Sequence, residues 1–367
     1  MHADGEFLLE VRDLRVAFHS RQGMVHAVDG ISLRVRRRRT VALVGESGCG
    51  KSATALSVLR LIPTSTGGPT GGQIIFRDGA TRVDLLGLGL AALQRIRGNR
   101  IAMIFQEPMT ALNPVYSVGE QIAEVIELHQ GAGRRAAWSA TVEMLRRVGI
   151  PDAPRRAGDY PHQFSGGMRQ RAMIAMALAC RPALLIADEP TTALDPTIQQ
   201  QILRLLDELK QELGMSILLI SHDLGVVGQV ADEVYVMYAG RIVEHGPVAD
   251  VLNRPLHPYT QALLRCTPRG SRTGERAARS TRLPTIPGMV PDAADPPSGC
   301  RFHPRCALTA ERAVGAGRGA LAVKSEFGAA VLRRCVERFD EEPSGQPALV
   351  EKASGHFVAC WEAERAT

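Results

Sequence analysis

Gly45-Glu46-Ser47-Gly48-Cys49-Gly50-Lys51-Ser52 is the stretch that decides the fold of this chain. It has the form G-x-x-x-x-G-K-S, the phosphate-binding loop, in which backbone N–H groups form a cradle for phosphate oxygens. The apolar run Thr40 to Val44 precedes it, and the helix-forming run Ala53 to Leu61 follows it. The loop is therefore expected between a buried strand and a helix N-terminus, whose partial positive charge favours an anion. The chain is predicted to bind a nucleoside triphosphate.

The residues expected to hold the nucleotide phosphates share this loop and the start of its helix. They are Gly45, Ser47, Gly48, Cys49, Gly50, Lys51, Ser52 and Ala53. Lys51 is placed to reach the β- and γ-phosphates, and the Ser52 hydroxyl is the natural inner ligand for Mg²⁺.

Further short motifs follow in a fixed order: Gln106, then Ser165-Gly166-Gly167, then Leu184 to Glu189, then His222. Taken alone, a Ser-Gly-Gly is usually a turn and an Asp-Glu pair is usually a solvated face. Because each occurs once and in this order, together they argue against a purely structural explanation. Ser165 and its two glycines precede a helix, so this helix end is predicted to be a second anion site.

The periodicity predicts an α/β core with a helical insertion. Strands alternate with helices, which implies a mainly parallel sheet covered on both faces. The predicted strands are Leu8 to Phe18 (as a pair turning near Asp13), Ala27 to Val35, Gln73 to Phe76 (an edge strand after the loop Gly67 to Gly72), Arg100 to Phe105, Ala183 to Ala187, Ser216 to Ile220, and a hairpin of Val234 to Tyr238 with Arg241 to Glu244. The predicted helices after residue 118 are Gly119 to Leu128, Arg134 to Val148, Gly166 to Ala179 and Thr197 to Leu213.

Composition narrows the class of protein. With 367 residues, 45% hydrophobic and 22% charged, the chain has the composition of a soluble globular protein of two or three domains. The net charge of +6 is carried mostly by scattered arginines, and aromatic residues are only 4%, which argues against nucleic-acid binding. The densest basic run, Arg34 with Arg36 to Arg39, is expected on a solvated strand edge, with attraction to an anionic membrane surface as the next interpretation.

The chain is expected to be cytosolic, with any membrane attachment made through partners. Its first six residues are acidic in character, and no apolar stretch is long enough to span a bilayer. In a reducing compartment its seven cysteines are not expected to form structural disulfides.

The order of these motifs resembles the nucleotide-binding subunit of an ABC transporter. The surrounding sequence resembles more specifically the ATPase subunits of oligopeptide and dipeptide importers, on three stretches: Phe105 to Pro114, Tyr160 to Arg171, and His257-Pro258-Tyr259-Thr260. The resemblance runs from about Leu8 to Pro268 and resumes at Leu283 to Cys306, whereas Ala307 to Val331 departs from it. It implies a nucleotide-binding domain over 1–268 with a helical subdomain at about 107–182, a linker at 269–282 and a Cys-bearing C-terminal domain over 283–367.

The resemblance also implies a role for each motif. Glu189 is similar to the general base that polarises the attacking water, and Asp188 to the carboxylate that holds Mg²⁺ without touching it directly. Gln106 resembles the residue that senses both metal and water, and His222 the histidine that bonds the γ-phosphate. Phe18 stands where the family has the aromatic that stacks on adenine, with a core phenylalanine as the competing interpretation.

Two cassettes are implied, because Ser165, Gly166 and Gly167 belong to a different subdomain from the phosphate loop. In the family this Ser-Gly-Gly motif, called the signature, closes over the ATP bound by the partner cassette. Asp195 would lie at the interface between the two cassettes. Only one phosphate loop is present, so a second ATPase subunit is expected, with a heterodimer favoured. Two permease subunits and an external solute-binding protein are the other implied partners, on the cytosolic side of the cell membrane, with coupling through Glu107 to Val118.

The function expected from this resemblance is ATP hydrolysis that powers import of di- or oligopeptides. An alternative is a soluble ABC ATPase acting on nucleic acid or ribosomes, although such proteins typically carry two cassettes or a long coiled-coil insertion, and this chain has neither. Nickel and glutathione importers share this type of ATPase, so the substrate stays open.

Four cysteines mark the C-terminal part: Cys300, Cys306, Cys335 and Cys360. Their spacing fits no standard zinc ribbon, and spacing alone leaves structural thiols or a metal site. The flanking sequence resembles the tail that binds a 4Fe–4S cluster in some of these ATPases, with zinc held by cysteines and His303 or His356 as the alternative. Cys49, Cys180 and Cys266 are expected to be ordinary thiols.

Overall fold

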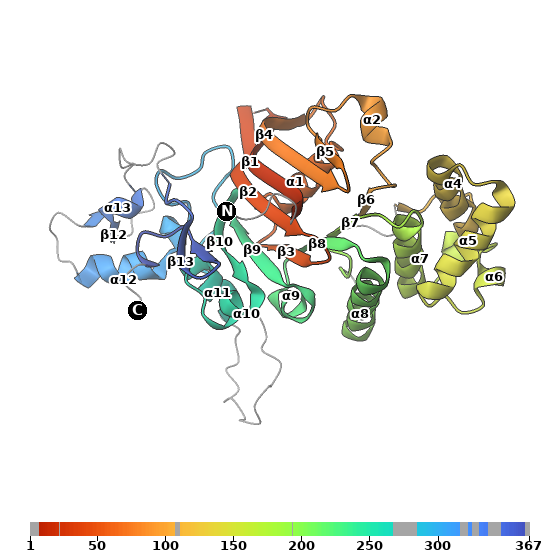
Figure 1. Ribbon diagram of the computed structural model, residues 1–367. Helices are drawn as coiled ribbons and strands as arrows, with labels where there is room; N and C mark the ends of the chain where they lie inside the picture. The colour runs from red at the N-terminus through yellow and green to blue at the C-terminus, as the bar shows by residue number, and fades with distance from the viewer. Residues whose placement is uncertain are drawn as a thin grey trace, which may run out of the picture.

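The computed structural model describes residues 7–21, 23–106, 111–192, 194–266, 285–315, 322–324, 330–336 and 346–363. Its strands form a four-stranded sheet in the order β2-β1-β4-β5, an eight-stranded sheet in the order β13-β14-β10-β9-β3-β8-β7-β6, and a two-stranded sheet of β11 and β12 (Figure 1). The strands are β1 Phe7–Ser20, β2 Gly23–Arg36, β3 Thr40–Val44, β4 Gly67–Asp78, β5 Thr81–Asp84, β6 Ile101–Ile104, β7 Leu184–Asp188, β8 Ser216–Ser221, β9 Glu233–Tyr238, β10 Arg241–Pro247, β11 Ala322–Lys324, β12 Ala330–Leu332, β13 Val350–Ala353 and β14 His356–Val358.

The helices cover the sheets or form the insertion. They are α1 Lys51–Val58, α2 Leu90–Gln94, α4 Val118–Gln130, α5 Arg134–Arg147, α6 Ala153–Arg156, α7 Gly166–Leu178, α8 Pro196–Leu213, α9 Leu224–Val230, α10 Val248–Asn253, α11 Pro258–Cys266, α12 Ala307–Gly315 and α13 Arg333–Val336, with short 3₁₀ turns at Pro161–Gln163 and His303–Arg305. No helix among the described residues is long and apolar enough to cross a membrane.

The eight-stranded sheet is parallel through its centre, as the sequence predicts. Strands β9, β3, β8, β7 and β6 pair in parallel, and β10, β14 and β13 add an antiparallel edge. Successive side chains of β3 face opposite sides: Val41 and Leu43 join the core under the four-stranded sheet, whereas Ala42 and Val44 join the core under α9 and α11. Burial on both faces explains why this strand is a continuous apolar run.

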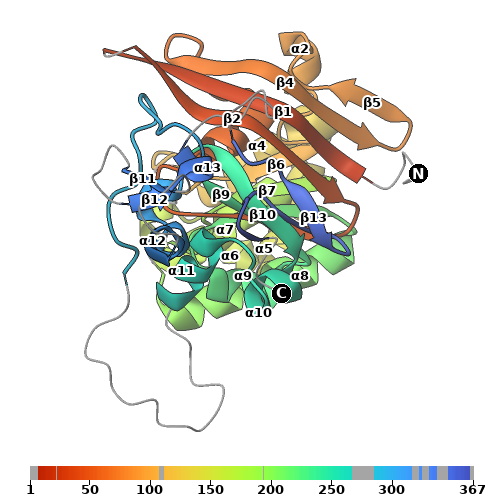
Figure 2. The ribbon, with the colours of Figure 1, turned by 90° about the vertical axis from the view of Figure 1, so that its left-hand side faces the viewer.

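The antiparallel sheet forms a separate layer at the top of Figure 2 and packs on α1, and it corrects the predictions for the N-terminal strands. Residues Leu8 to Phe18 do not form a strand pair, because they lie within the single strand β1. Asp13, where the turn was expected, has φ +46° and marks a shift in the register with β2, so it is a bulge in one strand.

The glycine-rich run 67–72 is not a loop, and the strand that follows it is not at an edge. Both belong to β4, which lies between β1 and β5. A Cβ at Gly67 would lie 2.2 Å from Ala17 O, and a Cβ at Gly72 would lie 2.5 Å from Asp13 O. The glycines therefore let two strands approach closely, one of the positions that strand glycines commonly mark.

The helical insertion agrees with the expected pattern. Helices α4, α5 and α7 lie together at one end of the molecule (Figure 1) and share one apolar core with the adjoining face of β6 and β7. Ser117 begins α4 with a capping box, in which its hydroxyl accepts from Glu120 N and Glu120 bonds back to Ser117 N. The fold class is thus as predicted: an α/β core, a mainly parallel sheet and a helical insertion.

The C-terminal part packs directly onto the nucleotide-binding core. Strand β14 pairs with β10, and Phe302 lies in the same apolar core as Tyr238 and Tyr259. The domain boundaries at about residues 268 and 283 stay predictions, and the linker expected at 269–282 lies outside the described residues.

The buried His257 gives the fold a specific dependence on pH. Burial lowers the pKa of His257 to about 4, against the opposing effect of Glu244. Between pH 6.5 and 4 the unfolded chain binds a proton that the folded chain does not, so this contribution to stability is complete above pH 6.5 and is lost as pH falls. Wild-type protein should lose about 2 kcal/mol of unfolding free energy from this residue between pH 7 and pH 5. Urea unfolding at both pH values measures it, and His257→Asn should flatten that part of the slope; equal slopes would contradict the assignment.

Candidate nucleotide site

The phosphate loop joins the end of β3 to the start of α1. Gly50, with φ +106°, is the residue at the N-terminal end of α1. A Cβ at Gly45 would lie 2.1 Å from Met237 O, and one at Gly50 would lie 2.3 Å from Ala27 O. Two neighbouring backbones thus press against the loop, and only glycine fits at these two positions. The sequence places its glycines where the fold requires them.

Lys51 lies inside the loop that precedes it. Its ammonium group donates to Gly45 O at 2.8 Å and to Glu46 O at 3.0 Å, and the residue is buried. The loop therefore concentrates a positive charge and the partial charges of a helix N-terminus at one point, which is the arrangement that binds phosphate.

Ser52 and Asp188 meet beside this loop. The Ser52 side chain hydrogen-bonds to Asp188 at the end of β7, and Asp188 Oδ1 is buried without a hydrogen-bond partner. Burial raises the pKa of Asp188, and the neighbouring Glu189 charge raises it further, against the Ser52 hydrogen bond. A buried carboxylate oxygen with no protein donor can accept a hydrogen bond from a water on Mg²⁺, an ion that keeps several waters when it binds with substrate phosphates. Ser52 and Asp188 therefore fit the Mg²⁺ ion that accompanies a nucleoside triphosphate.

Glu189 is the centre of a hydrogen-bonded group. Its carboxylate lies 3.0 Å from His222 Nδ1 and accepts from Gln106 Nε2 at 3.1 Å and from Thr192 Oγ1 at 2.9 Å. Burial acts to raise its pKa, but the hydrogen bonds of His222 and Thr192 outweigh burial and lower it below the usual value. The carboxylate is thus ionised at neutral pH and held in one orientation.

Three of these residues come from the ends of neighbouring strands. Gln106 lies just after β6, Glu189 after β7 and His222 after β8, and these strands are adjacent and parallel. Because the carboxyl ends of parallel strands meet at one edge of the sheet, residues 83 and 33 positions apart in sequence come within hydrogen-bonding distance. Thr192 is the member that the sequence analysis missed.

Ser165 and Asp195 lie at the starts of α7 and α8, outside the phosphate loop. Ser165 caps α7, its hydroxyl accepting from Met168 N at 3.3 Å, and α7 packs with α4 and α5 in the insertion, apart from α1 (Figure 1). Asp195 caps α8 through Thr197 N and Ile198 N. Phe18 is half-buried in β1 and packs against the core beneath the antiparallel sheet. Within one chain Ser165, at the start of α7, is not brought together with the phosphate loop (Figure 1), whereas Phe18 packs against the same apolar core as Cys49 of that loop.

The four C-terminal cysteines gather around one small pocket. Cys300, Cys306, Cys335 and Cys360 line it together with His257 and Phe302, and none of these four forms a disulfide bond. Burial raises the pKa of Cys300 well above its usual value, and its neighbours Cys306, Cys360 and Cys335 act in the same direction. In the part of the chain that the structure describes, however, no three His, Cys, Asp or Glu side chains are arranged to hold a metal ion. His356 Nε2 lies 2.8 Å from Glu244 Oε1.

Comparison with known proteins defines the class. The family model "ABC transporter" matches residues 28–192, and the model "Oligopeptide/dipeptide transporter, C-terminal region" matches residues 243–312. A putative peptide import ATP-binding protein of Brucella ovis is 53% identical over 328 residues, which are 89% of this chain and 97% of the relative. A probable peptide ABC transporter ATP-binding protein of Sinorhizobium fredii is 47% identical over 356 residues, 97% of this chain and 95% of the relative.

Solved structures agree with this assignment. The cbiO1 protein of Clostridium perfringens, described as part of the ABC transporter complex cbiONQ, has a TM-score of 0.57 at 28% identity and covers 68% of this chain and 92% of its own. The ATP-binding cassette MJ0796, solved as a dimer bound to ADP and Pi, has a TM-score of 0.58 at 24% identity, covering 65% of this chain and 98% of its own, and supports the fold alone. This chain belongs to the ATP-binding subunits of ABC transporters, in the branch that carries the oligopeptide/dipeptide transporter C-terminal region, and is an ATPase of that family.

Proposed function

We propose that this chain is the ATP-hydrolysing subunit of an ABC importer for di- or oligopeptides. The observation that carries the proposal is the combination of the hydrogen-bonded group around Glu189 at the strand ends with the oligopeptide/dipeptide C-terminal region. Relatives about half identical to the chain, over nearly its full length, are named as peptide import ATP-binding proteins. The membrane permeases, the solute-binding protein and a position at the cytosolic face of the cell membrane belong to this proposal.

The proposed chemistry follows from the geometry around Glu189. Gly45, Ser47, Gly48, Cys49, Gly50, Ser52 and Ala53 hold the phosphates through their backbone, and Lys51 turns its ammonium group to the β- and γ-phosphates. Ser52, Gln106 and Asp188 would hold the Mg²⁺ that accompanies ATP, and this ion would supply charge neutralisation at the phosphates. Glu189, ionised and oriented by Thr192 and His222, accepts the proton of the attacking water. Phe18 is proposed to stack on adenine.

The second anion site acts on a partner's nucleotide. Ser165, Gly166 and Gly167 present N–H groups at the N-terminus of α7, a helix of 13 residues, and Asp195 caps α8 nearby in sequence. Since these groups lie apart from the chain's own phosphate loop, two cassettes must pair head to tail for both anion sites to meet one ATP. A related second ATPase subunit, giving a heterodimer, is the proposed partner.

A groove on the helical insertion is the proposed docking site for the permease. Of the coupling run Glu107 to Val118, residues 107–110 lie outside the described residues. The described remainder carries two exposed apolar side chains, Val115 and Tyr116, and the groove is lined by Tyr116, Gln121, Glu124, Arg134 and Trp138. In sequence, the coupling run begins directly after Gln106, so we expect a change at Gln106 and Glu189 to move it.

Replacing Tyr116 with Ala should uncouple transport from hydrolysis. Basal ATP hydrolysis of the purified subunit should stay within about twofold of wild type, because Tyr116 makes no contact with the catalytic group, whereas uptake by the complete transporter should fall at least about tenfold, the loss of one buried aromatic anchor. Leu128→Ala, an exposed apolar residue of the same insertion outside the groove, is the matched control. A proportional fall of hydrolysis and uptake would contradict the docking role.

The four C-terminal cysteines are proposed to hold a 4Fe–4S cluster. The support is that the four cysteines line one pocket, and that four cysteine ligands are the set such a cluster takes. Protein prepared without oxygen should absorb near about 400 nm, as thiolate-ligated iron does. Cys300→Ser should remove the band and Cys266→Ser, which lies outside the pocket, should keep it. Colourless protein with stoichiometric zinc would overturn the cluster.

The proposal as a whole is tested by affinity capture of the tagged chain from solubilised native membranes, followed by mass spectrometry. Two permeases, a second ATPase and a solute-binding protein are the expected companions. Recovery with ribosomal proteins or nucleic acid, and without permeases, would replace import by the soluble alternative. A co-captured binding protein that takes nickel or glutathione would replace only the peptide substrate.

A further inference from the structure

The phosphate loop is held from outside by the C-terminal part of the chain. Glu46, the second residue of the loop, is paired with Arg305, which lies in the short turn between Cys300 and Cys306. Arg305 Nη1 lies 2.7 Å from Glu46 Oε2, and Arg305 Nη2 lies 3.2 Å from Glu46 Oε1. The Arg305 side chain is only 4% exposed. This is a bidentate arginine–carboxylate pair, in which the arginine both compensates the charge of the carboxylate and sets its orientation.

The backbone of Glu46 is fixed at two further points. Its N–H donates to Tyr259 Oη at 2.9 Å, and its carbonyl accepts from Lys51 Nζ. Tyr259 is fully buried and packs on Tyr238 and Phe302, at ring distances of 4.7 and 5.4 Å. Phe302 belongs to the same segment as Arg305. The packed rings of Tyr259 and Phe302 therefore connect the backbone of Glu46 with the segment that carries Arg305.

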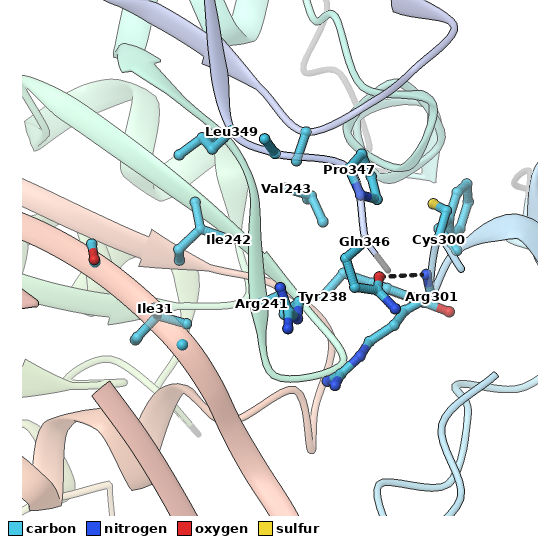
Figure 3. Close-up of a pocket in the computed structure, with 15 residues that line it drawn as sticks. Ile31, Tyr238, Arg241, Ile242, Val243, Cys300, Arg301, Gln346, Pro347 and Leu349 are labelled. Carbon is cyan, nitrogen blue, oxygen red and sulfur yellow. Dashed lines mark hydrogen bonds between the residues drawn. The ribbon is translucent and has the colours of Figure 1, made fainter. Parts of the chain in front are cut away.

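A second arginine of this segment supports the other side of the loop. Arg301 bonds to Asp29 of β2 and to Ala239 O in the turn between β9 and β10, next to Arg241 and Tyr238 (Figure 3). Gly240 of that turn donates its N–H to Cys49 O at 2.9 Å. The turn is therefore fixed on one side by Arg301 and on the other by the phosphate loop.

A carboxylate in a phosphate-binding loop needs such a partner. The unpaired charge of Glu46 would act against the polyphosphate that the loop is built to bind, because like charges repel most strongly where water is partly excluded. Arg305 neutralises that charge and fixes the loop at the same time.

We propose that Arg305 is a positioning residue for ATP binding, through which the Cys300–Cys306 segment sets the shape and charge of the phosphate loop. The inference concerns the ATP site alone, so it stands apart from the proposed peptide substrate. It places a requirement for nucleotide binding in a part of the chain about 250 residues beyond the loop in sequence.

Arg305→Ala should raise the KM for ATP, and the Kd for a fluorescent ATP analogue, about tenfold, since removing one partner leaves a charge uncompensated in a partly buried site. The kcat at saturating ATP should stay within about twofold, because Glu189 and its partners are untouched. Arg305→Lys, which keeps the charge but loses the bidentate geometry, should lie between. Arg312→Ala, whose partner Glu362 lies within the C-terminal part, is the matched control and should bind ATP as wild type does.

Glu46→Gln in the Arg305→Ala background separates charge from packing. If Arg305 acts by compensating Glu46, this double variant should recover ATP affinity to within about threefold of wild type, a coupling that a double-mutant cycle measures. Three outcomes would overturn the proposal: unchanged affinity in Arg305→Ala, an equal loss in Arg312→Ala, or a loss of kcat with KM unchanged. If Arg305→Ala does not fold, Arg305→Lys and the double variant carry the same comparison.

Discussion

Replacing Glu189 with Gln should reduce ATP hydrolysis by about 10²- to 10⁴-fold, the contribution of a general base, while leaving ATP binding nearly unchanged. The amide keeps the shape of the carboxylate but cannot accept the proton of the attacking water. Glutamine can still bond to Thr192 and His222, so the loss belongs to the chemistry and not to the fold. Phosphate release and equilibrium binding of a fluorescent ATP analogue measure the two effects separately.

The control for this substitution is Glu208→Gln, an exposed glutamate of α8 that also follows an aspartate. It should hydrolyse ATP at the wild-type rate. If ATP binding and hydrolysis fell in parallel in Glu189→Gln, Glu189 would be holding nucleotide or metal, and the assignment of the base would be wrong. We expect the head-to-tail pair to separate once its ATP is hydrolysed. This variant should therefore also accumulate as an ATP-bound pair, visible as a larger species in size-exclusion chromatography.

Replacing Gly45 with Ala should weaken ATP binding by at least about tenfold. The added Cβ would lie 2.1 Å from Met237 O, a backbone atom of β9, at a φ of +155° that alanine rarely adopts. The loop or the strand must shift, at a cost of about 1–3 kcal/mol for a backbone held in such a conformation. This displacement of the loop would move its N–H groups away from the phosphates. Isothermal titration with ATP and Mg²⁺ measures the result.

Gly131→Ala gives the matched comparison, because Gly131 ends α4 at φ +63° in open space, far along the chain from the loop. It carries backbone strain without an overlap, so it should lower stability slightly and keep ATP affinity. Wild-type affinity in Gly45→Ala would show that the close approach to β9 does not shape the loop.

Most of the fold could be predicted because each central strand has its own local signal. Strand β3 is apolar from Val41 to Val44 and is followed by glycines, and β7 and β8 end at polar residues. The strand ends, and the edge of the sheet that carries Glu189, therefore follow from the sequence. Glu189, Gln106 and His222 come together for the same reason.

The errors lie where long-range packing overrides local signals. A glycine-rich run normally indicates a loop, but here it lets β4 pass close to β1. Asp13, where a turn was expected, forms a bulge within β1. Thr192 was missed because its contact with Glu189 depends on the turn in which Glu189 has φ +47°, which no local pattern specifies.

The position of the C-terminal part was equally beyond local prediction. Its arginines reach Asp29 and Glu46, more than 250 residues earlier, and only the folded chain places them there. The same short segment carries two of the proposed cluster ligands and the partner of the phosphate loop. A cluster held by Cys300 and Cys306 would fix the turn that carries Arg305, which connects the two proposals at one point of the fold.

The central claim is that ATP hydrolysis at Glu189 drives peptide import. The most direct test is uptake of a labelled dipeptide by cells that lack this subunit and are complemented with wild type or with Glu189→Gln. Wild type should restore uptake and Glu189→Gln should not, with equal amounts of both proteins recovered in the membrane fraction. Restored uptake by Glu189→Gln, or no peptide uptake with wild type, would contradict the account.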